Sequence, residues 1–190
     1  MTRQYKNDWF TTNIPYFENL LDKTKMKQVL EIGSYEGLST NYILDNYPGT
    51  IVTCVDSWEG GFEHTEASID MKSVYDRFLS NTKEHSSRLE ILKGNSADQL
   101  IKINHRRDFY DFVYVDGGHT AIDVLQDLIL SFPLLKVGGI MGMDDYQWGL
   151  DTDPPHKIPY HAIKMFALAY QEKIHILAVG NQLWIKKING

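Results

Sequence analysis

From about residue 28 onward, short apolar runs alternate with segments of helical periodicity. We predict a strand over each of five runs: Gln28–Ile32, Ile51–Val55, Leu89–Leu92, Phe112–Val115 and Gly139–Met143. Strands that alternate with helices are typical of repeated βα units around a parallel sheet. The alternation therefore predicts an α/β protein with a doubly wound sheet.

The segments between the strands contain the predicted helices, which begin near Leu38, near Met71, after Ser96 and after Thr120. Before the first strand, an amphipathic helix is expected over Ile14–Leu21, where it would cover the sheet or the entrance to a ligand site. A chain of 190 residues is long enough for one substantial core and short for two. We expect a single domain over residues 1–190, with a helical cover over 1–27 and a catalytic core over 28–190.

The end of the chain follows a different pattern. After a helix expected over Ala162–Tyr170, two β-like runs follow, Ile174–Val179 and Gln182–Lys187, separated by Gly180 and Asn181. Two such runs joined by a Gly-Asn pair predict a β-hairpin. The predicted fold is therefore a Rossmann-like sheet that is mostly parallel and ends in an antiparallel hairpin.

Charge and composition limit the partners. The formal net charge is −6 and the Lys and Arg residues are scattered, which speaks against a surface that follows nucleic-acid phosphates. No apolar run approaches the length of a membrane-spanning helix. The one cysteine, Cys54, excludes an internal disulfide and is expected in the core. We expect a soluble, cytoplasmic protein that binds a small molecule and neither nucleic acid nor membrane.

The first candidate site is the turn after the first predicted strand, with the pattern Glu31-x-Gly33-x-x-x-Gly37. Glycines in such a turn let the backbone approach a ligand closely, and the helix that follows directs its N–H groups into the same space. Glu31 would repel a pyrophosphate there and would attract the sulfonium and ammonium groups of S-adenosylmethionine. The alternative is a tight turn that binds no ligand.

Two further strand ends fit a nucleoside. Asp56 follows the second strand, where a carboxylate can accept both ribose hydroxyls, as in nucleotide-binding folds. The loop Lys93–Asp98 follows the third strand and would reach an adenine edge through Asn95 and Ser96. The alternatives are a turn or helix cap by Asp56 and a helix N-cap by Ser96.

Three carboxylates are expected to converge at the same edge of the sheet. Asp116 ends the fourth predicted strand, and Asp144 and Asp145 end the fifth. Such acids would repel one another without a cation, and Mg²⁺ prefers oxygen ligands. His119 would lie in the same cleft, where its intrinsic pKa suits it to accept a proton from a hydroxyl. The alternatives are turn formation by Asp144 and Asp145 and a helix-start role for His119.

These motifs resemble those of class I S-adenosylmethionine-dependent methyltransferases with a catechol O-methyltransferase-like metal site, especially a small bacterial branch acting on sugars and natural products. The resemblance spans Val29 to Lys187. It rests on the acidic glycine turn, Val55-Asp56-Ser57, Gly94-Asn95-Ser96, Asp116-Gly117-Gly118-His119, the run from Gly138 to Tyr146 and the closing hairpin.

The family resemblance implies a role for each matching residue. The methionine part of the cofactor would contact Glu31, Gly33, Tyr35 and Ser39, its ribose Asp56, and its adenine Ser57 and Ser96. Gly37, Asn95 and Asp116 complete the expected cofactor contacts, and Asp116, Asp144 and Asp145 match the family's metal ligands. The catechol enzymes have lysine at the position of His119, whereas the sugar-modifying branch is similar to this chain in using histidine as the base. That branch often has a Glu-Asp pair where this chain has Asp144-Asp145.

The resemblance implies a Mg²⁺-dependent O-methyltransferase in which Asp116 and His119 are catalytic and the acceptor is a hydroxyl of a sugar or another small molecule. A metal-independent small-molecule methyltransferase of this fold and a non-catalytic adenosyl-ligand binding module stay open as alternatives. A nicotinamide oxidoreductase is disfavoured by the glycine spacing and by Glu31. Acceptor selection is assigned to the N-terminal helix and to the loops Glu59–Ser68 and Tyr146–Pro159, and a homodimer is left open.

Overall fold

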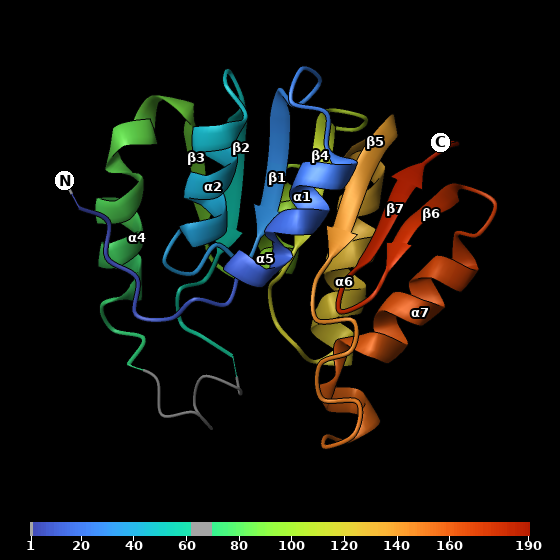
Figure 1. Ribbon diagram of the computed structural model, residues 1–190. Helices are drawn as coiled ribbons and strands as arrows, with labels where there is room; N and C mark the ends of the chain where they lie inside the picture. The colour runs from blue at the N-terminus through green and yellow to red at the C-terminus, as the bar shows by residue number, and fades with distance from the viewer. Residues whose placement is uncertain (1, 62–69) are drawn as a thin grey trace.

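Figure 1 shows the computed structural model of the chain, in which a central sheet has helices on both faces. The structure describes residues 2–61 and 70–190. In this part of the chain, seven strands form one sheet in the order β3-β2-β1-β4-β5-β7-β6. They are β1 Gln28–Ile32, β2 Ile51–Asp56, β3 Leu89–Lys93, β4 Tyr110–Val115, β5 Leu135–Met143, β6 Ile174–Val179 and β7 Leu183–Lys187.

The strand directions confirm the predicted sheet. The first five strands pair in parallel, and β7 lies antiparallel between β5 and β6. Because parallel strands end at the same edge, the residues that follow β1, β2, β4 and β5 are brought together. In Figure 1 the arrowheads of β1 and β5 point down, toward this carboxyl edge of the sheet.

The largest difference from the predicted strand bounds is in β5, which begins at Leu135 and not at Gly139. The pairing of β4 with β5 is irregular, since Tyr110 lies opposite Leu135 whereas Phe112 lies opposite Ile140. Gly138 has a φ of 88°, which lets the backbone bulge between these two pairs. Gly138 and Gly139, in the middle of the strand, interrupt its apolar pattern, which is why the first half of the strand was not predicted.

Among the described residues, three helices cover each face of the sheet. They are α1 Ile14–Leu20, α2 Leu38–Asn46 and α4 Val74–Thr82 on one face, and α5 Ser96–Lys102, α6 Ala121–Ser131 and α7 Pro159–Ala169 on the other. Alternate residues of β1 enter different cores, since Val29 packs with the first group of helices and Leu30 with the second. Within the described residues, none of the helices combines the length and the apolarity needed to cross a membrane.

The helix ends refine the sequence predictions. The helix expected near Met71 begins at Val74, and the one expected over Ala162–Tyr170 begins at Pro159, a position that suits proline because its missing N–H would have no helical partner there. Asn95, and not Ser96, is the N-cap of α5, because its side chain accepts the N–H of Asp98.

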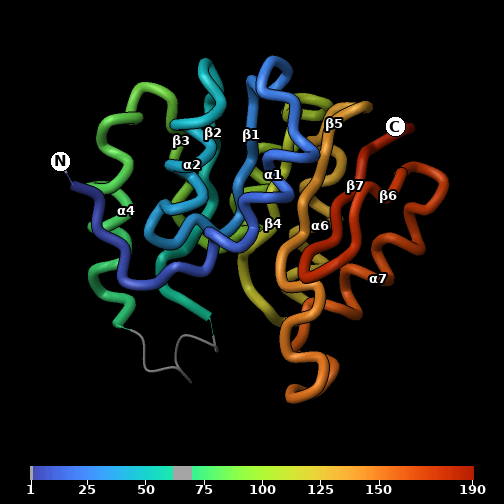
Figure 2. The backbone as a smooth tube through the Cα atoms, viewed as in Figure 1, coloured from blue at the N-terminus to red at the C-terminus, as the bar shows by residue number. Residues whose placement is uncertain are grey.

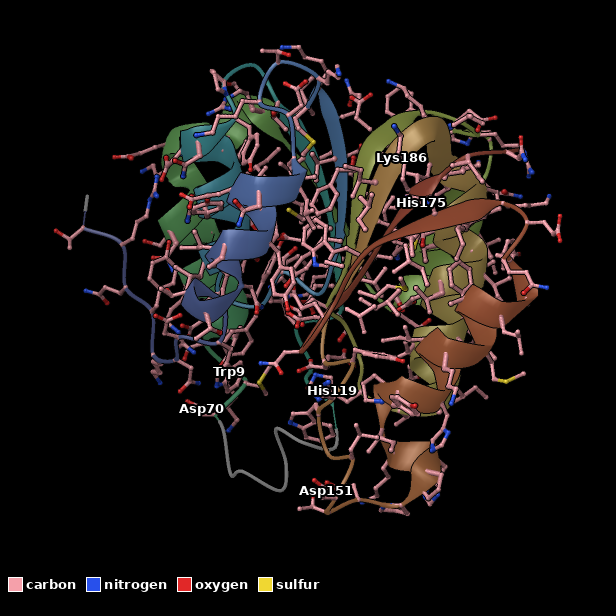
Figure 3. All side chains as sticks on the ribbon, turned by 45° about the vertical axis from the view of Figure 1, so that its right-hand side comes forward. Trp9, Asp70, His119, Asp151, His175 and Lys186 are labelled. Atoms are coloured by element: carbon pink, nitrogen blue, oxygen red, sulfur yellow. The ribbon has the colours of Figure 1, made fainter. Side chains whose placement is uncertain are left out.

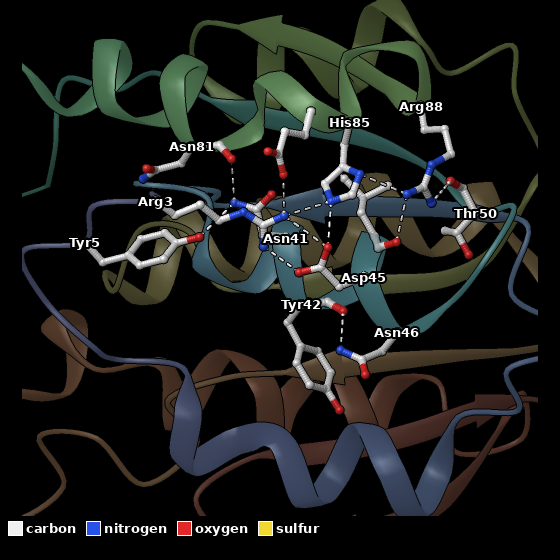
Figure 4. Close-up of polar contacts among 12 residues, drawn as sticks. Arg3, Tyr5, Asn41, Tyr42, Asp45, Asn46, Thr50, Asn81, His85 and Arg88 are labelled. Carbon is white, nitrogen blue, oxygen red and sulfur yellow. Dashed lines mark hydrogen bonds and ion pairs between the residues drawn. The ribbon is translucent and has the colours of Figure 1, made fainter. Parts of the chain in front are cut away.

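The N-terminal segment, residues 2–13, lies against α2 and α4 and then passes along the carboxyl edge of the sheet before α1 begins, as Figure 2 shows. Figure 4 shows how it is anchored. Arg3 forms a two-pronged ion pair with Asp45 of α2, and His85 Nε2 lies 2.7 Å from the same carboxylate. The Tyr5 hydroxyl accepts a hydrogen bond of 2.8 Å from Asn41. The segment is thus fixed to the helices on one face of the sheet.

A close backbone contact holds two strand ends together. Gly33 follows β1 with a φ of 88°, and a Cβ built there would lie 1.8 Å from the carbonyl oxygen of Asp116, at the end of β4. Gly138 has the same φ, and a Cβ there would meet nothing within 4 Å. A side chain at Gly138 would therefore add backbone strain alone, whereas one at Gly33 would add the same strain and a steric overlap.

We predict that Gly138→Ala lowers the free energy of unfolding by about 1 kcal/mol, the cost of a left-handed conformation for a side chain with a Cβ. Gly33→Ala adds the overlap with Asp116, so its loss should exceed about 3 kcal/mol. Urea unfolding followed by circular dichroism measures both values. Equal losses for the two variants would show that the close approach of β1 to β4 is not a constraint.

Candidate active site

Glu31 lies in a fully buried polar pocket at the end of β1. Its carboxylate accepts hydrogen bonds of 2.6 Å from the Ser34 hydroxyl and 2.7 Å from the Ser39 hydroxyl, and a further one from Thr40. Burial raises the pKa of Glu31, and these hydroxyl donors partly offset that effect. The acid predicted at the glycine turn therefore also ties the turn to the first residues of α2.

Asp56, at the end of β2, organises the glycine turn. Its Oδ2 accepts the backbone N–H groups of Ser34 and Tyr35 at 2.9 and 2.8 Å, and its Oδ1 accepts that of Trp58 at 2.7 Å. Tyr35 and Trp58 both have left-handed backbone conformations, with φ of 46° and 55°. Strained non-glycine residues are concentrated at functional sites more often than elsewhere. The structure thus shows Asp56 capping the turn, as the alternative interpretation expected, and its ribose role stays a prediction.

The predicted acids meet in one small cavity, lined by Asp116, His119, Asp144 and Asp145. One ligand atom from each of Asp116, His119 and Asp145 lies within 4.8 Å of the others, a spacing that could hold a metal ion. His119 Nε2 lies 2.9 Å from Asp145 Oδ2. Figure 3 shows His119 at the carboxyl edge, where Trp9 of the N-terminal segment also lies.

The charges in this cavity oppose one another. Burial raises the pKa of Asp116 well above its usual range, and the neighbouring carboxylates of Asp144 and Asp145 raise it further. Burial, followed by the charge of Asp145, raises the pKa of Asp144 to about 6. Like charges at such distances favour protonation unless a cation neutralises them. The donor set therefore fits a hard divalent cation, which binds carboxylate oxygens and relieves this repulsion.

Asp144 has partners that its sequence position did not reveal. Its Oδ2 accepts hydrogen bonds from the Tyr114 hydroxyl and, at 2.7 Å, from Asn13 of the N-terminal segment. Its Oδ1 accepts the N–H of Asp145 at 2.8 Å. Tyr114 is completely buried on β4, and its place in an apolar strand gave no sign of a polar role. Asn13 precedes an amphipathic helix, which predicts only a helix cap.

A second missed group is Asp127, on α6 under the loop that follows β4. It is 1% exposed, and a Cβ built at Gly117 would lie 3.2 Å from its Oδ2. Neither oxygen accepts a hydrogen bond of ordinary geometry from the described residues. Burial raises the pKa of Asp127 to about 7, an effect that the Ser96 hydroxyl partly offsets. Helical periodicity could not distinguish this buried acid from a solvated one.

The remaining predicted cofactor residues lie at strand ends of the same edge and have local partners. The Ser57 hydroxyl accepts the N–H of Glu59 at 3.1 Å, and Asn95 caps α5. Gly37 has a φ of 81° and packs against α4, which explains its glycine without a ligand. The cofactor contacts of these residues stay predictions.

Of the two loops predicted to select the acceptor, the first, Glu59–Ser68, falls mostly outside the described residues, which resume at residue 70. The second, Tyr146–Pro159, is described and lies beside the acidic cavity. Its Trp148 ring packs against His119 at a centroid distance of 4.6 Å, and Tyr146 packs against Tyr160 at 5.0 Å. The Trp148 ring therefore walls one side of His119.

Comparisons with known proteins identify relatives. The sequence model of a family described as methyltransferase domain matches residues 30–146. A Dictyostelium discoideum protein named probable caffeoyl-CoA O-methyltransferase 2 is 24% identical over 156 residues, which are 80% of this chain and 62% of that protein. The chain thus spans about three fifths of the length of this curated relative.

Two solved structures have a similar fold. The first is the MycE methyltransferase of the mycinamycin biosynthetic pathway in complex with Mg and SAH, with a TM-score of 0.65, 17% identity and coverage of 97% of this chain and 51% of that one. The second is the O-methyltransferase TomG of Streptomyces achromogenes in complex with SAM, with a TM-score of 0.65, 17% identity and coverage of 87% and 74%.

The raised pKa of Asp127 predicts a pH-dependent stability. An unfolded aspartic acid ionises near pH 4, so between about pH 4 and 7 the folded chain binds the extra proton. The contribution of Asp127 to stability therefore falls as pH rises through this window and is constant above it. Asp127→Asn removes this penalty. The free energy of unfolding of the variant, minus that of the wild type, should therefore be about 2 to 4 kcal/mol larger at pH 8 than at pH 4.5.

Urea unfolding at the two pH values tests this, with Asp151→Asn, an exposed acid of a nearby loop, as the matched control. A stability difference between the Asp127→Asn variant and the wild type that does not change with pH would contradict the assignment.

Proposed function

Because the chain belongs to the methyltransferase family that matches residues 30–146 and has the fold of class I, S-adenosylmethionine-dependent enzymes, we propose that it methylates a hydroxyl oxygen of a small molecule beside a bound Mg²⁺ ion. The observation that supports this most directly is the meeting of Asp116, Asp144, Asp145 and His119 in one cavity. The same backbone that brings Asp116 there touches the glycine turn at Gly33. A methyl donor and an acceptor site would thus adjoin.

The residues of the glycine turn would bind the methyl donor. S-adenosylmethionine supplies a methyl group already activated by its positively charged sulfur. Glu31 and Asp56 lie close enough to Asp116 to raise its pKa, and an edge that gathers carboxylates in this way favours a cationic donor over a pyrophosphate. Asp56 accepts the backbone N–H groups of Ser34, Tyr35 and Trp58, which fix its carboxylate beside the turn, where it would accept the ribose hydroxyls.

Asp116, Asp144 and Asp145 would hold the metal. All three offer carboxylate oxygens, whereas an imidazole is a poor ligand for Mg²⁺. When bound, the ion would supply Lewis-acid polarisation of the acceptor hydroxyl and fix its position. Oδ2 of Asp144 already accepts two side-chain donors and Oδ1 accepts one backbone donor, so Oδ1 has more acceptor capacity left for the ion.

His119 is the proposed base that accepts the acceptor's proton. Its Nε2 lies in the cavity beside Asp145, and packing against Trp148 limits the rotation of its ring. Both contacts would keep the imidazole oriented toward a hydroxyl held among the acids. The histidine at this position favours a sugar or natural-product hydroxyl over a catechol, in line with the fold shared with MycE. The main contribution to rate would be the alignment of oxygen, methyl and sulfur.

The first test compares ligand binding with turnover. We expect S-adenosylhomocysteine, and not NAD, to bind in calorimetry. His119→Ala and Asp116→Asn should keep S-adenosylhomocysteine affinity within about threefold to tenfold and lose at least about 100-fold in methyl transfer to a panel of sugar and phenolic hydroxyls, followed by mass spectrometry. Asp151→Ala, outside the cavity, is the control. Normal turnover in both site variants would refute the roles of base and ligand.

The second test removes the metal. Dialysis against EDTA should abolish methyl transfer, leave S-adenosylhomocysteine binding intact and be reversed by added Mg²⁺, because the ion acts on the acceptor and not on the donor. Transfer that survives chelation would instead support a metal-independent methyltransferase. Binding of S-adenosylhomocysteine without transfer to any acceptor would support an adenosyl-ligand module.

A further inference from the structure

The N-terminal segment contacts both halves of the candidate active site. Asn7 Nδ2 donates a hydrogen bond of 3.1 Å to the Tyr35 hydroxyl, and the Trp9 ring packs on that of Tyr35 at 5.0 Å. Asn13, six residues after Asn7, donates a hydrogen bond to Asp144, which lies 131 residues further along the chain. The segment thus connects the glycine turn to the acidic cavity.

Asn13 occupies a helix-capping position without acting as a cap. It directly precedes α1, where an asparagine side chain ordinarily accepts a backbone N–H from the first turn. Its side chain makes no such bond, and the residue is 7% exposed. Instead its Nδ2 donates to Asp144 Oδ2 at 2.7 Å and to the Tyr114 hydroxyl oxygen at 3.2 Å. Asn13 also ends a 3-10 turn, Thr11–Asn13, that runs directly into α1, and its amide contacts the acid.

The hydrogen bonds around Asp144 run in one direction. Trp184 Nε1 donates to Gln182 Oε1 at 2.7 Å, and Gln182 Nε2 donates to the Tyr114 hydroxyl oxygen at 2.9 Å. The Tyr114 hydroxyl then donates to Asp144 Oδ2, the same oxygen that Asn13 contacts. Donors in such a chain strengthen one another, so the chain fixes the position of the Asp144 carboxylate.

We propose that Asn13 is a positioning residue for the metal, on the ground that it and Tyr114 together occupy Oδ2 of Asp144, so that Oδ1 would be the oxygen left for the ion. This inference rests on the metal site of the proposed function. Groups that hydrogen-bond a metal's ligands orient them, and their loss commonly weakens metal binding 10- to 100-fold. The N-terminal segment then belongs to the active site, although it lies outside the family match.

The experiment measures Mn²⁺ as a paramagnetic probe of the Mg²⁺ site, by electron paramagnetic resonance of the free ion in the presence of saturating S-adenosylhomocysteine. Asn13→Ser retains a good N-cap but is too short to reach Asp144. We expect Asn13→Ser and Asn13→Ala to weaken Mn²⁺ binding at least about tenfold. S-adenosylhomocysteine affinity should stay within about threefold in both variants, because the ion acts on the acceptor and not on the donor.

The matched control is Asn19→Ala, because Asn19 also lies in the N-terminal helical region but donates only to the Pro15 carbonyl. Wild-type affinity for Mn²⁺ in both Asn13 variants would overturn the inference while leaving the metal site in place. A wild-type chain that binds S-adenosylhomocysteine but no Mn²⁺ would remove the metal site itself and the inference with it. A fall in Mn²⁺ affinity that Asn19→Ala shares equally would assign the effect to the helix and overturn the role of Asn13.

Discussion

The approach of β1 to β4 at their carboxyl ends is the constraint on which the site depends. Gly33 lets the backbone of the turn touch the carbonyl oxygen of Asp116, and no other residue type leaves that space free. The register of the two parallel strands places Ile32 beside Val115, so the turn and the acidic loop start side by side. A donor site and a cation site become neighbours because two strands end together.

The second constraint is electrostatic. The folded chain gathers Asp116, Asp144 and Asp145 in one cavity, with Glu31 and Asp56 near enough to add to the repulsion. Donors oppose this at particular atoms, as the hydroxyls do around Glu31 and the amide of Asn13 does at Asp144. Without a cation, the repulsion among these carboxylates destabilises the folded chain. With a cation bound, the same carboxylates attract the ion and their repulsion is relieved.

Much of this could be predicted from the sequence, for physical reasons. Strands that alternate with helices imply a parallel sheet, and a parallel sheet brings the acids at the ends of β4 and β5 to one edge. Side-chain partners that come from distant segments could not be predicted. Asn13 looks like a helix cap, Tyr114 like a core residue, and Asp127 like a solvated helix acid, because local patterns describe neighbours in sequence and not in space. The early start of β5 was missed since Gly138 breaks the apolar pattern.

The proposed site depends on where a cation binds. The most direct measurement is a crystal structure with S-adenosylhomocysteine and Mn²⁺, in which anomalous scattering locates the ion independently of any assumed ligand. We predict one peak bound by oxygens of Asp116, Asp144 and Asp145, with the His119 imidazole beside it and outside its coordination shell, and the adenosyl ligand against the glycine turn. A peak elsewhere, or an ion bound through the nitrogen of His119 with Asp144 uninvolved, would contradict it.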